Sequence, residues 1–156
     1  MTPTLLSLLD TPRIAVNLDA PSKPDVLHAL ADLAATSDAV TDPVLLLDDI
    51  RAREDLISTG VGEGIALPHA RTRAVTQTVA AFATLAEPVD YDSLDGTPVR
   101  LVLLIAGPES ERHHHVRLLS RVSRVLSDPQ TRDRLAASED ASAVLATFED
   151  AESRLA

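Results

Sequence analysis

Apolar residues recur along the chain at two spacings, every second residue in some segments and every third or fourth residue in others. The first spacing is typical of β-strands and the second of amphipathic α-helices. The strands predicted in this way span residues 14–18, 65–67, 78–85 and 101–105. The predicted helices span residues 5–9, 22–35, 43–57, 111–126, 130–137 and 141–148. Because helices and strands alternate, the pattern predicts an α/β sandwich with a central sheet.

Two of the predicted helices begin with clear capping signals. Ser22 precedes the first apolar stripe, and Asp42 followed by Pro43 pairs a capping side chain with the proline that favours a first helical turn. In the helix that starts at Pro43, four apolar residues are expected to share the buried face: Leu46, Leu47, Ile50 and Ile57. Arg53 falls at the flank of that face and not on the opposite side of the helix.

A segment rich in turn-forming residues separates this helix from the next short strand. Gly60, Gly62 and Gly64 give the backbone freedom to turn sharply, and Pro68 ends the strand just before His69. The segment lacks the Gly-Lys-Ser/Thr ending of a P-loop, and its glycines do not have the spacing of a dinucleotide-binding loop. It is therefore predicted to be a shaped turn that delivers His69 at a strand end, where sites in α/β folds are common.

Three adjacent histidines open the long predicted helix, and helical geometry gives each a different direction. His115 falls near the centre of the apolar stripe formed by Leu118, Leu119, Val122, Val125 and Leu126. His113 points to the opposite side, and His114 sits at an edge. The three rings cannot bind one metal ion from a regular helix, and His115 is the one that is expected to face the interior.

A histidine pair with a nearby cation suits phosphoryl chemistry. A neutral imidazole nitrogen can attack phosphorus and later release the group, provided that its other nitrogen is held by a hydrogen bond. His69 can be this nucleophile, His115 a supporting donor and Arg53 a cationic clamp for the phosphoryl oxygens. The alternatives are an ordinary loop histidine at 69, a satisfied buried histidine at 115 and a surface ion pair at Arg53.

Length and charge narrow the classes of partner. The 156 residues fit one domain, 1–156, and Asp and Glu outnumber Lys and Arg by 24 to 14, which gives a net charge of -10. Such a chain is repelled by phosphate backbones and anionic lipid surfaces, so neither nucleic acid nor direct membrane binding is expected. The longest apolar run, residues 101–106, is too short to span a bilayer, and no signal peptide is predicted.

The residues that are absent narrow the chemistry. There is no Cys, which is compatible with a reducing cytoplasm and excludes thiolate metal sites. The histidines do not have the spacing of a zinc motif, and the Asp90, Asp92 and Asp95 loop does not follow the EF-hand pattern. No metal and no other cofactor is therefore expected.

The histidine segments resemble those of a known family. Arg53-Glu54-Asp55-Leu56-Ile57-Ser58-Thr59-Gly60-Val61-Gly62-Glu63-Gly64-Ile65-Ala66-Leu67-Pro68-His69 is similar to the active-site signature of the type-2 EIIA domain. This is the fructose, mannitol and nitrogen-regulatory EIIA of the bacterial phosphoenolpyruvate-dependent sugar phosphotransferase system. His115-Val116-Arg117-Leu118-Leu119-Ser120 resembles the segment around the family's second histidine. The resemblance extends over residues 5–148.

The resemblance implies a fold and a function. The fold is a central mixed β-sheet flanked by helices on both faces. His69 would accept a phosphoryl group on its Nε2 (tele) nitrogen from the phosphocarrier HPr and pass it to a cysteine of EIIB, assisted by Arg53 and His115. His114 is the fallback for the supporting histidine. EIIB and EIIC would be separate chains, so any association with the membrane is indirect.

Two branches of the family remain open. Ala70, directly after His69, favours the fructose-like branch, in which the protein serves sugar transport as a cytoplasmic phosphotransferase component. The alternative is the nitrogen-regulatory branch, which reports its phosphorylation state by binding other proteins. A domain that no longer accepts phosphate is disfavoured because both histidines are present.

Overall fold

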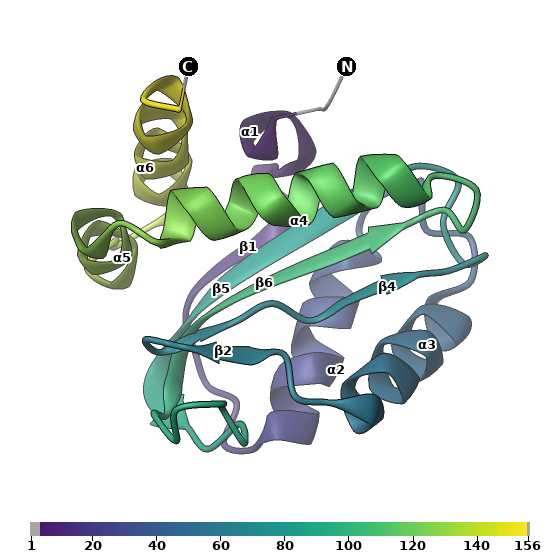
Figure 1. Ribbon diagram of the computed structural model, residues 1–156, viewed down its shortest axis with the longest axis horizontal. Coiled ribbons are helices and arrows are strands. Elements are labelled where there is room, and N and C mark those ends of the chain that lie inside the picture. The colour runs from purple at the N-terminus through teal and green to yellow at the C-terminus, as the bar shows by residue number, and fades with distance from the viewer. Residues whose placement is uncertain (1–3, 156) are drawn as a thin grey trace.

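Six strands form one mixed sheet in the computed structural model, which describes residues 4–155 (Figure 1). The strands are β1 (Ile14–Leu18), β2 (Gly60–Gly62), β3 (Ile65–Ala66), β4 (His69–Arg71), β5 (Val79–Val89) and β6 (Val99–Gly107). They lie in the order β1-β5-β6-β3-β2, and β4 also pairs with β6. The β5–β6 and β2–β3 pairs are antiparallel, whereas β1–β5, β3–β6 and β4–β6 are parallel. The predicted mixed sheet is therefore confirmed.

Helices cover both faces of this sheet, as predicted. Helices α2 (Lys23–Ala34) and α3 (Pro43–Leu56) pack on one face. The other face is covered by α1 (Leu5–Leu8), α4 (Arg112–Leu126), α5 (Pro129–Ala136) and α6 (Ala141–Ser153). Between residues 4 and 155, no helix combines the length and the apolar character that crossing a bilayer requires.

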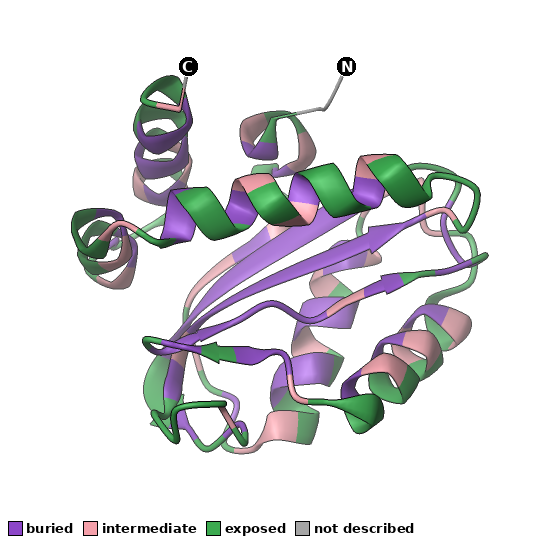
Figure 2. Cartoon of the chain, viewed as in Figure 1, coloured by how far each residue is buried: buried purple, intermediate pink, exposed green. Residues whose placement is uncertain are grey.

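The two long central strands divide the core into two halves (Figure 2). Side chains alternate along each strand, so Ala81 and Leu104 face α2 and α3, whereas Phe82 and Ile105 face the other helices. The aromatic rings of Phe82 and Phe148 meet edge to face with centroids 5.1 Å apart. Burial on both sides explains why these strands read as nearly continuous apolar runs.

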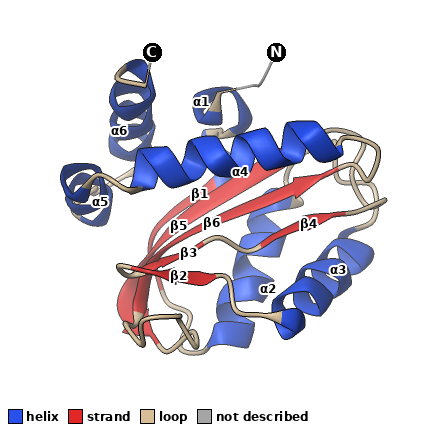
Figure 3. Cartoon of the chain, in the orientation of Figure 1, coloured by secondary structure: helices blue, strands red, loops and turns tan. Residues whose placement is uncertain are grey.

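Strands β3 and β4 are two pieces of one interrupted strand along β6 (Figure 3). Ile65 lies opposite Leu101, whereas His69 lies opposite Ile105. Pro68 sits in the break, and although it has no N–H, its carbonyl accepts a hydrogen bond from the Ile105 N–H at 3.0 Å. Pairing therefore continues through the break, and His69 is fixed to the sheet.

The predicted start signals act as expected. Ser22 caps α2 by accepting from the Asp25 N–H, and Asp42 caps α3 by accepting from the Leu45 N–H at 3.1 Å. The β2–β3 hairpin turns at Glu63 and Gly64, both with positive φ, 58° and 77°. Two consecutive positive φ values are what a tight hairpin turn needs, and Gly64 adopts its value without strain.

The structure differs from the predicted elements in several places. Strand β4 was not predicted, and β2 lies inside what was predicted as a turn. Strand β5 continues to Val89, and α6 continues to Ser153. Ile57 was assigned to the buried face of α3, but the chain is already extended there and its side chain is 57% exposed. The third buried position on that helix is Glu54, a charged residue that an apolar pattern does not reveal.

Candidate active site

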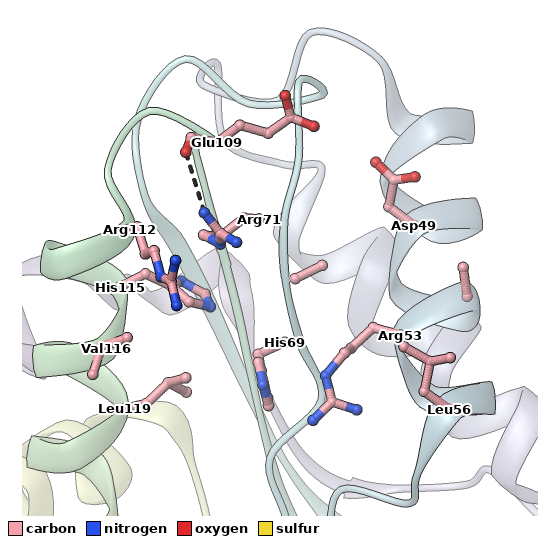
Figure 4. A pocket seen from close by; sticks show the side chains of 12 residues that line it. Asp49, Arg53, Leu56, His69, Arg71, Glu109, Arg112, His115, Val116 and Leu119 are labelled. Carbon is pink, nitrogen blue, oxygen red and sulfur yellow. Dashed lines mark hydrogen bonds between the residues drawn. The ribbon is translucent and has the colours of Figure 1, made fainter.

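A pocket of about 630 Å³ opens at the sheet edge formed by β4, between α3 and α4 (Figure 4). Its lining includes His69 from β4, His115 from α4 and Arg53 from α3. The three residues singled out in the sequence are thus brought together from three separate elements. Figure 4 shows His69 between Arg53 on one side and His115 on the other.

The ring of His69 is held in one tautomer. Its Nδ1 lies 2.7 Å from the carbonyl oxygen of Leu67. Because a carbonyl oxygen only accepts, Nδ1 carries the proton and donates it, and Nε2 keeps its lone pair. Burial lowers the pKa of His69 below 6.5, more than the bond to Leu67 raises it, and the positive charge of Arg53 lowers it further. The ring is therefore neutral near neutral pH, and its Nε2 has the lone pair that a nucleophile requires.

His115 is buried, as helix phase predicted, with 5% of its surface exposed. Its ring centroid lies 5.7 Å from that of His69. Burial lowers its pKa to about 4, helped by the nearby charges of His69, Arg71 and His114. Its Nδ1 has no hydrogen-bond partner and packs beside Gly107, where an added Cβ would stand 3.2 Å away. Gly107 thus leaves the room in which the ring sits.

His114 lies outside this pocket. Its side chain is 30% exposed and its Nδ1 is 3.7 Å from a carboxylate oxygen of Glu111. Geometry therefore places His115, and not the fallback His114, beside His69. His113 is exposed on the opposite side of α4, as predicted.

Arg53 lies in the last turn of α3, and its side chain lines the pocket. Its Nη1 donates to the Ile57 carbonyl at 3.2 Å, and no carboxylate within the described chain lies within ion-pair distance. The surface ion pair that the sequence left open at Arg53 is therefore not formed.

The next residue, Glu54, is the centre of a buried polar network that the sequence did not predict. Its carboxylate is 3.1 Å from the Lys23 Nζ and accepts from the Thr59 N–H at 2.7 Å and from the Tyr91 hydroxyl at 3.1 Å. The Thr59 hydroxyl also donates to it. Burial and the neighbouring Glu54 charge raise the pKa of Tyr91, which keeps the phenol protonated as a donor. The network ties the end of α3 to the loop that follows it.

Two further arginines, Arg71 and Arg112, line the pocket and were also missed. The signal for both was present. Arg71 lies two residues after His69, and alternate strand residues share a face. Arg112 lies three residues before His115, and such residues share a helix face. The position of Arg71 depends on β4, which the sequence does not predict, whereas the spacing of Arg112 from His115 is visible within the predicted helix.

The pocket combines two imidazoles with three guanidinium groups, and burial holds both imidazoles neutral. Guanidinium groups and neutral imidazoles can together hold a tetrahedral oxyanion that is bonded to a ring nitrogen. Across residues 4–155, no three His, Asp or Glu side chains gather closely enough to hold a metal ion.

The sequence of this chain matches a known protein family over most of its length. Residues 7–151 match the family described as "Phosphoenolpyruvate-dependent sugar phosphotransferase system, EIIA 2". The nitrogen regulatory protein of Pseudomonas aeruginosa is 36% identical over 140 residues, which cover 90% of this chain and 91% of that protein. The fructose-specific EIIA component of Haloferax volcanii is 37% identical over 131 residues, 83% of this chain and 85% of that one.

Solved structures have the same fold. The nitrogen regulatory protein IIA-Ntr of Neisseria meningitidis superposes with a TM-score of 0.87 at 29% identity, covering 92% of this chain and 98% of that one. The mannitol enzyme IIA of Escherichia coli, solved in complex with phosphorylated enzyme IIB, has a TM-score of 0.78 at 24% identity and covers 91% of this chain and 97% of that one.

Proposed function

Because this chain belongs to the type-2 EIIA family of the phosphoenolpyruvate-dependent sugar phosphotransferase system, we propose that it is a phosphocarrier whose acceptor is Nε2 of His69. The observation that carries the proposal is the 2.7 Å contact of His69 Nδ1 with the Leu67 carbonyl, which leaves only Nε2 free. That nitrogen belongs to a ring that lines a pocket with three arginines.

The proposed reaction is two in-line transfers. The lone pair of Nε2 attacks the phosphorus of the phosphohistidine on HPr, the donor N–P bond breaks, and the donor ring leaves with the electron pair. In the second transfer a cysteine thiolate of EIIB attacks the same phosphorus, and the bond to Nε2 breaks. The proton on Nδ1 stays in place throughout, so His69 returns to its starting tautomer.

Arg53 and His115 are proposed to assist at the phosphoryl oxygens. Arg53 supplies a guanidinium from α3, which can hold two oxygens at once. His115 is neutral above about pH 4, so it donates one N–H without adding a charge that would pair with and trap the dianion. No metal and no nucleotide takes part in this scheme.

The rim of the pocket suits transient partners. Leu56 and Val116 line it, with 81% and 57% of their surfaces exposed, on opposite sides of His69. Exposed apolar side chains beside a reactive group are typical of a modest docking surface. We propose HPr as the donor and an EIIB cysteine as the acceptor, since the mannitol relative is solved with its phosphorylated IIB. The exchange would take place in the cytoplasm.

The branch is proposed to be fructose-like, on the basis of Ala70. The nitrogen-regulatory alternative is supported by the Pseudomonas relative at 36% identity and by the Neisseria structure. Transfer from the labelled protein to a fructose-type EIIB domain separates the two. Rapid loss of label to the EIIB cysteine supports transport, whereas retained label under conditions that discharge a fructose EIIA supports regulation.

The first expected result is phosphoryl uptake by the unaltered protein. Incubation with phosphoenolpyruvate, Enzyme I and HPr should add one phosphoryl group, detected by intact-mass spectrometry. The adduct should be labile in acid and stable in base, as a phosphohistidine is. A protein that gains no mass while a control EIIA in the same mixture does would overturn the proposal.

The lowered histidine pKa values lead to a second expected result. In the unfolded chain both rings titrate near 6.5, so as the pH falls below 6.5 the unfolded state takes up protons first. The free energy of unfolding should therefore decrease from pH 6.5 toward about pH 4, where His115 protonates. NMR titration of the ring protons checks this directly, and a pKa above 6.5 for either ring would contradict it.

A further inference from the structure

We propose that Arg71 and Arg112 form a second phosphate-binding half of the pocket, which holds a tetrahedral phosphate dianion on the side away from Arg53. Two sources could supply that dianion, the phosphoryl group on His69 and free inorganic phosphate. The first source rests on the proposed function; the second does not.

Strand geometry brings Arg71 to the pocket. It is two residues beyond His69 in β4, so both side chains leave the same face of the strand, at a Cα separation of about 6.7 Å. Ala70, between them, is buried on the other face. An extended arginine side chain spans such a separation, and Arg71 lines the pocket together with His69.

Helix geometry brings Arg112 to the same pocket. It precedes His115 by one turn, and Val116 and Leu119 continue the same stripe along α4. Arg71 and Arg112 thus reach the pocket from two different elements, and Figure 4 shows both on the same side of His69 as His115. Arg71 lies close enough to His115 for its charge to contribute to the low pKa of that ring.

Glu109 and Asp49 also line the pocket, but neither forms an ion pair with these arginines. Within residues 4–155, neither guanidinium lies within 4.0 Å of a carboxylate oxygen. Arg71 makes one long contact of 3.4 Å to the carbonyl oxygen of Glu109. The other acid in the lining, Asp49, is occupied by the hydroxyl of Thr72 at 2.6 Å. Two cations therefore line one cavity without a carboxylate at ion-pair distance, although the chain has ten more acidic than basic residues, 24 against 14.

The place of Arg112 is unfavourable for the helix alone. It is the first residue of α4, no acidic residue stands in the first turn, and Glu111 makes no side-chain capping bond. A cation at this end opposes the helix dipole, whereas an anion is favoured there. A phosphate dianion bound here would offset the unfavourable interaction between the Arg112 charge and the helix dipole. Arg112 and Arg71 would then both act as cationic ligands of that dianion.

The first test measures the phosphoryl group itself. In ³¹P NMR, a nearby guanidinium favours the dianion and lowers the second pKa of the phosphoryl group. Arg71→Gln and Arg112→Gln should each raise that pKa by about 1 pH unit and slow uptake from phospho-HPr about tenfold. The pKa readout needs no partner, so a role of these arginines in docking would leave it unchanged.

Two other arginines, one on α4 and one just after β4, provide matched control variants. Arg73 follows β4 by two residues, and Arg117 is exposed on α4; both are outside the lining. Arg73→Gln and Arg117→Gln should leave the phosphoryl pKa unchanged and uptake within about twofold of the unaltered protein.

The second test uses inorganic phosphate on unphosphorylated protein at constant ionic strength. The side-chain Nε–Hε resonances of Arg71 and Arg112 should move with millimolar phosphate, while that of Arg73 should not. Movement here supports the half-site even if the protein accepts no phosphoryl group, so failure of the proposed function would be recognised separately. A phosphoryl effect without movement assigns the half-site to the group on His69 alone. Neither effect, or equal effects in the control variants, overturns the inference.

Discussion

Replacing His69 with alanine is expected to abolish phosphoryl uptake. The attack needs a lone pair on a nitrogen that faces the pocket, and His69 Nε2 is the one that the Leu67 contact leaves free. His115 cannot take over at the same rate, because its ring is buried and its pKa of about 4 makes it a weaker base and nucleophile. Intact-mass spectrometry after incubation with phosphoenolpyruvate, Enzyme I and HPr should show no adduct.

Two surface histidines supply the controls. His28 on α2 has 59% of its side chain exposed, and His113 is exposed on α4. His28→Ala and His113→Ala should take up label like the unaltered protein. Residual uptake in His69→Ala equal to that of these variants would place the acceptor elsewhere, and peptide mapping would then identify it.

Replacing Glu54 with alanine is expected to destabilise the fold by about 3–5 kcal/mol, because the removal of one partner leaves a buried charge and several donors unsatisfied. The groups left behind are the Lys23 ammonium, the Thr59 N–H and hydroxyl, and the Tyr91 hydroxyl. Lys23 is 19% exposed and can turn toward water, which favours the lower end of that range. Domains of this size are stable by only about 5–15 kcal/mol, so the loss is a large fraction.

Urea denaturation followed by circular dichroism measures this loss. Asp55, the next residue on α3, is exposed, so Asp55→Ala should change the free energy of unfolding by no more than about 0.5 kcal/mol. Glu54→Gln keeps an acceptor for Thr59, so its loss of unfolding free energy should lie between those of Asp55→Ala and Glu54→Ala. A Glu54→Ala variant as stable as Asp55→Ala would contradict this prediction and show that the network adds no net stability.

Local signals in the sequence predicted much of the fold. The caps at Ser22 and Asp42, the buried strands and the long helix before Asp128 all depend on neighbouring residues, which a single sequence displays. Helix phase also predicted that His115 turns inward and His113 outward, and the burial of each ring agrees. These features are set by backbone periodicity and need no knowledge of distant contacts.

What the sequence did not reveal depends on long-range pairing. Strand β4 has three residues, too few for a period to be seen, and it is defined by its parallel pairing with β6 more than thirty residues away. Without that strand, Arg71 could not be placed beside His69. Glu54 was hidden for another reason: its burial is offset by Lys23 and Tyr91, which lie on α2 and beyond β5. The proposed phosphoacceptor role of His69 rests on family resemblance, since composition and periodicity indicate only a histidine after a shaped turn.

In the proposed function, the bond between His69 and the Leu67 carbonyl also restricts how the two partner proteins can reach the ring. A ring held through Nδ1 cannot rotate by half a turn without losing that hydrogen bond. Only Nε2 can therefore react, and a partner can approach it along a single line. The proposed donor and acceptor would have to use this line one after the other, so they would compete for it. An excess of empty acceptor would then occupy the entrance and delay reloading, so throughput would peak at an intermediate acceptor concentration and decline above it.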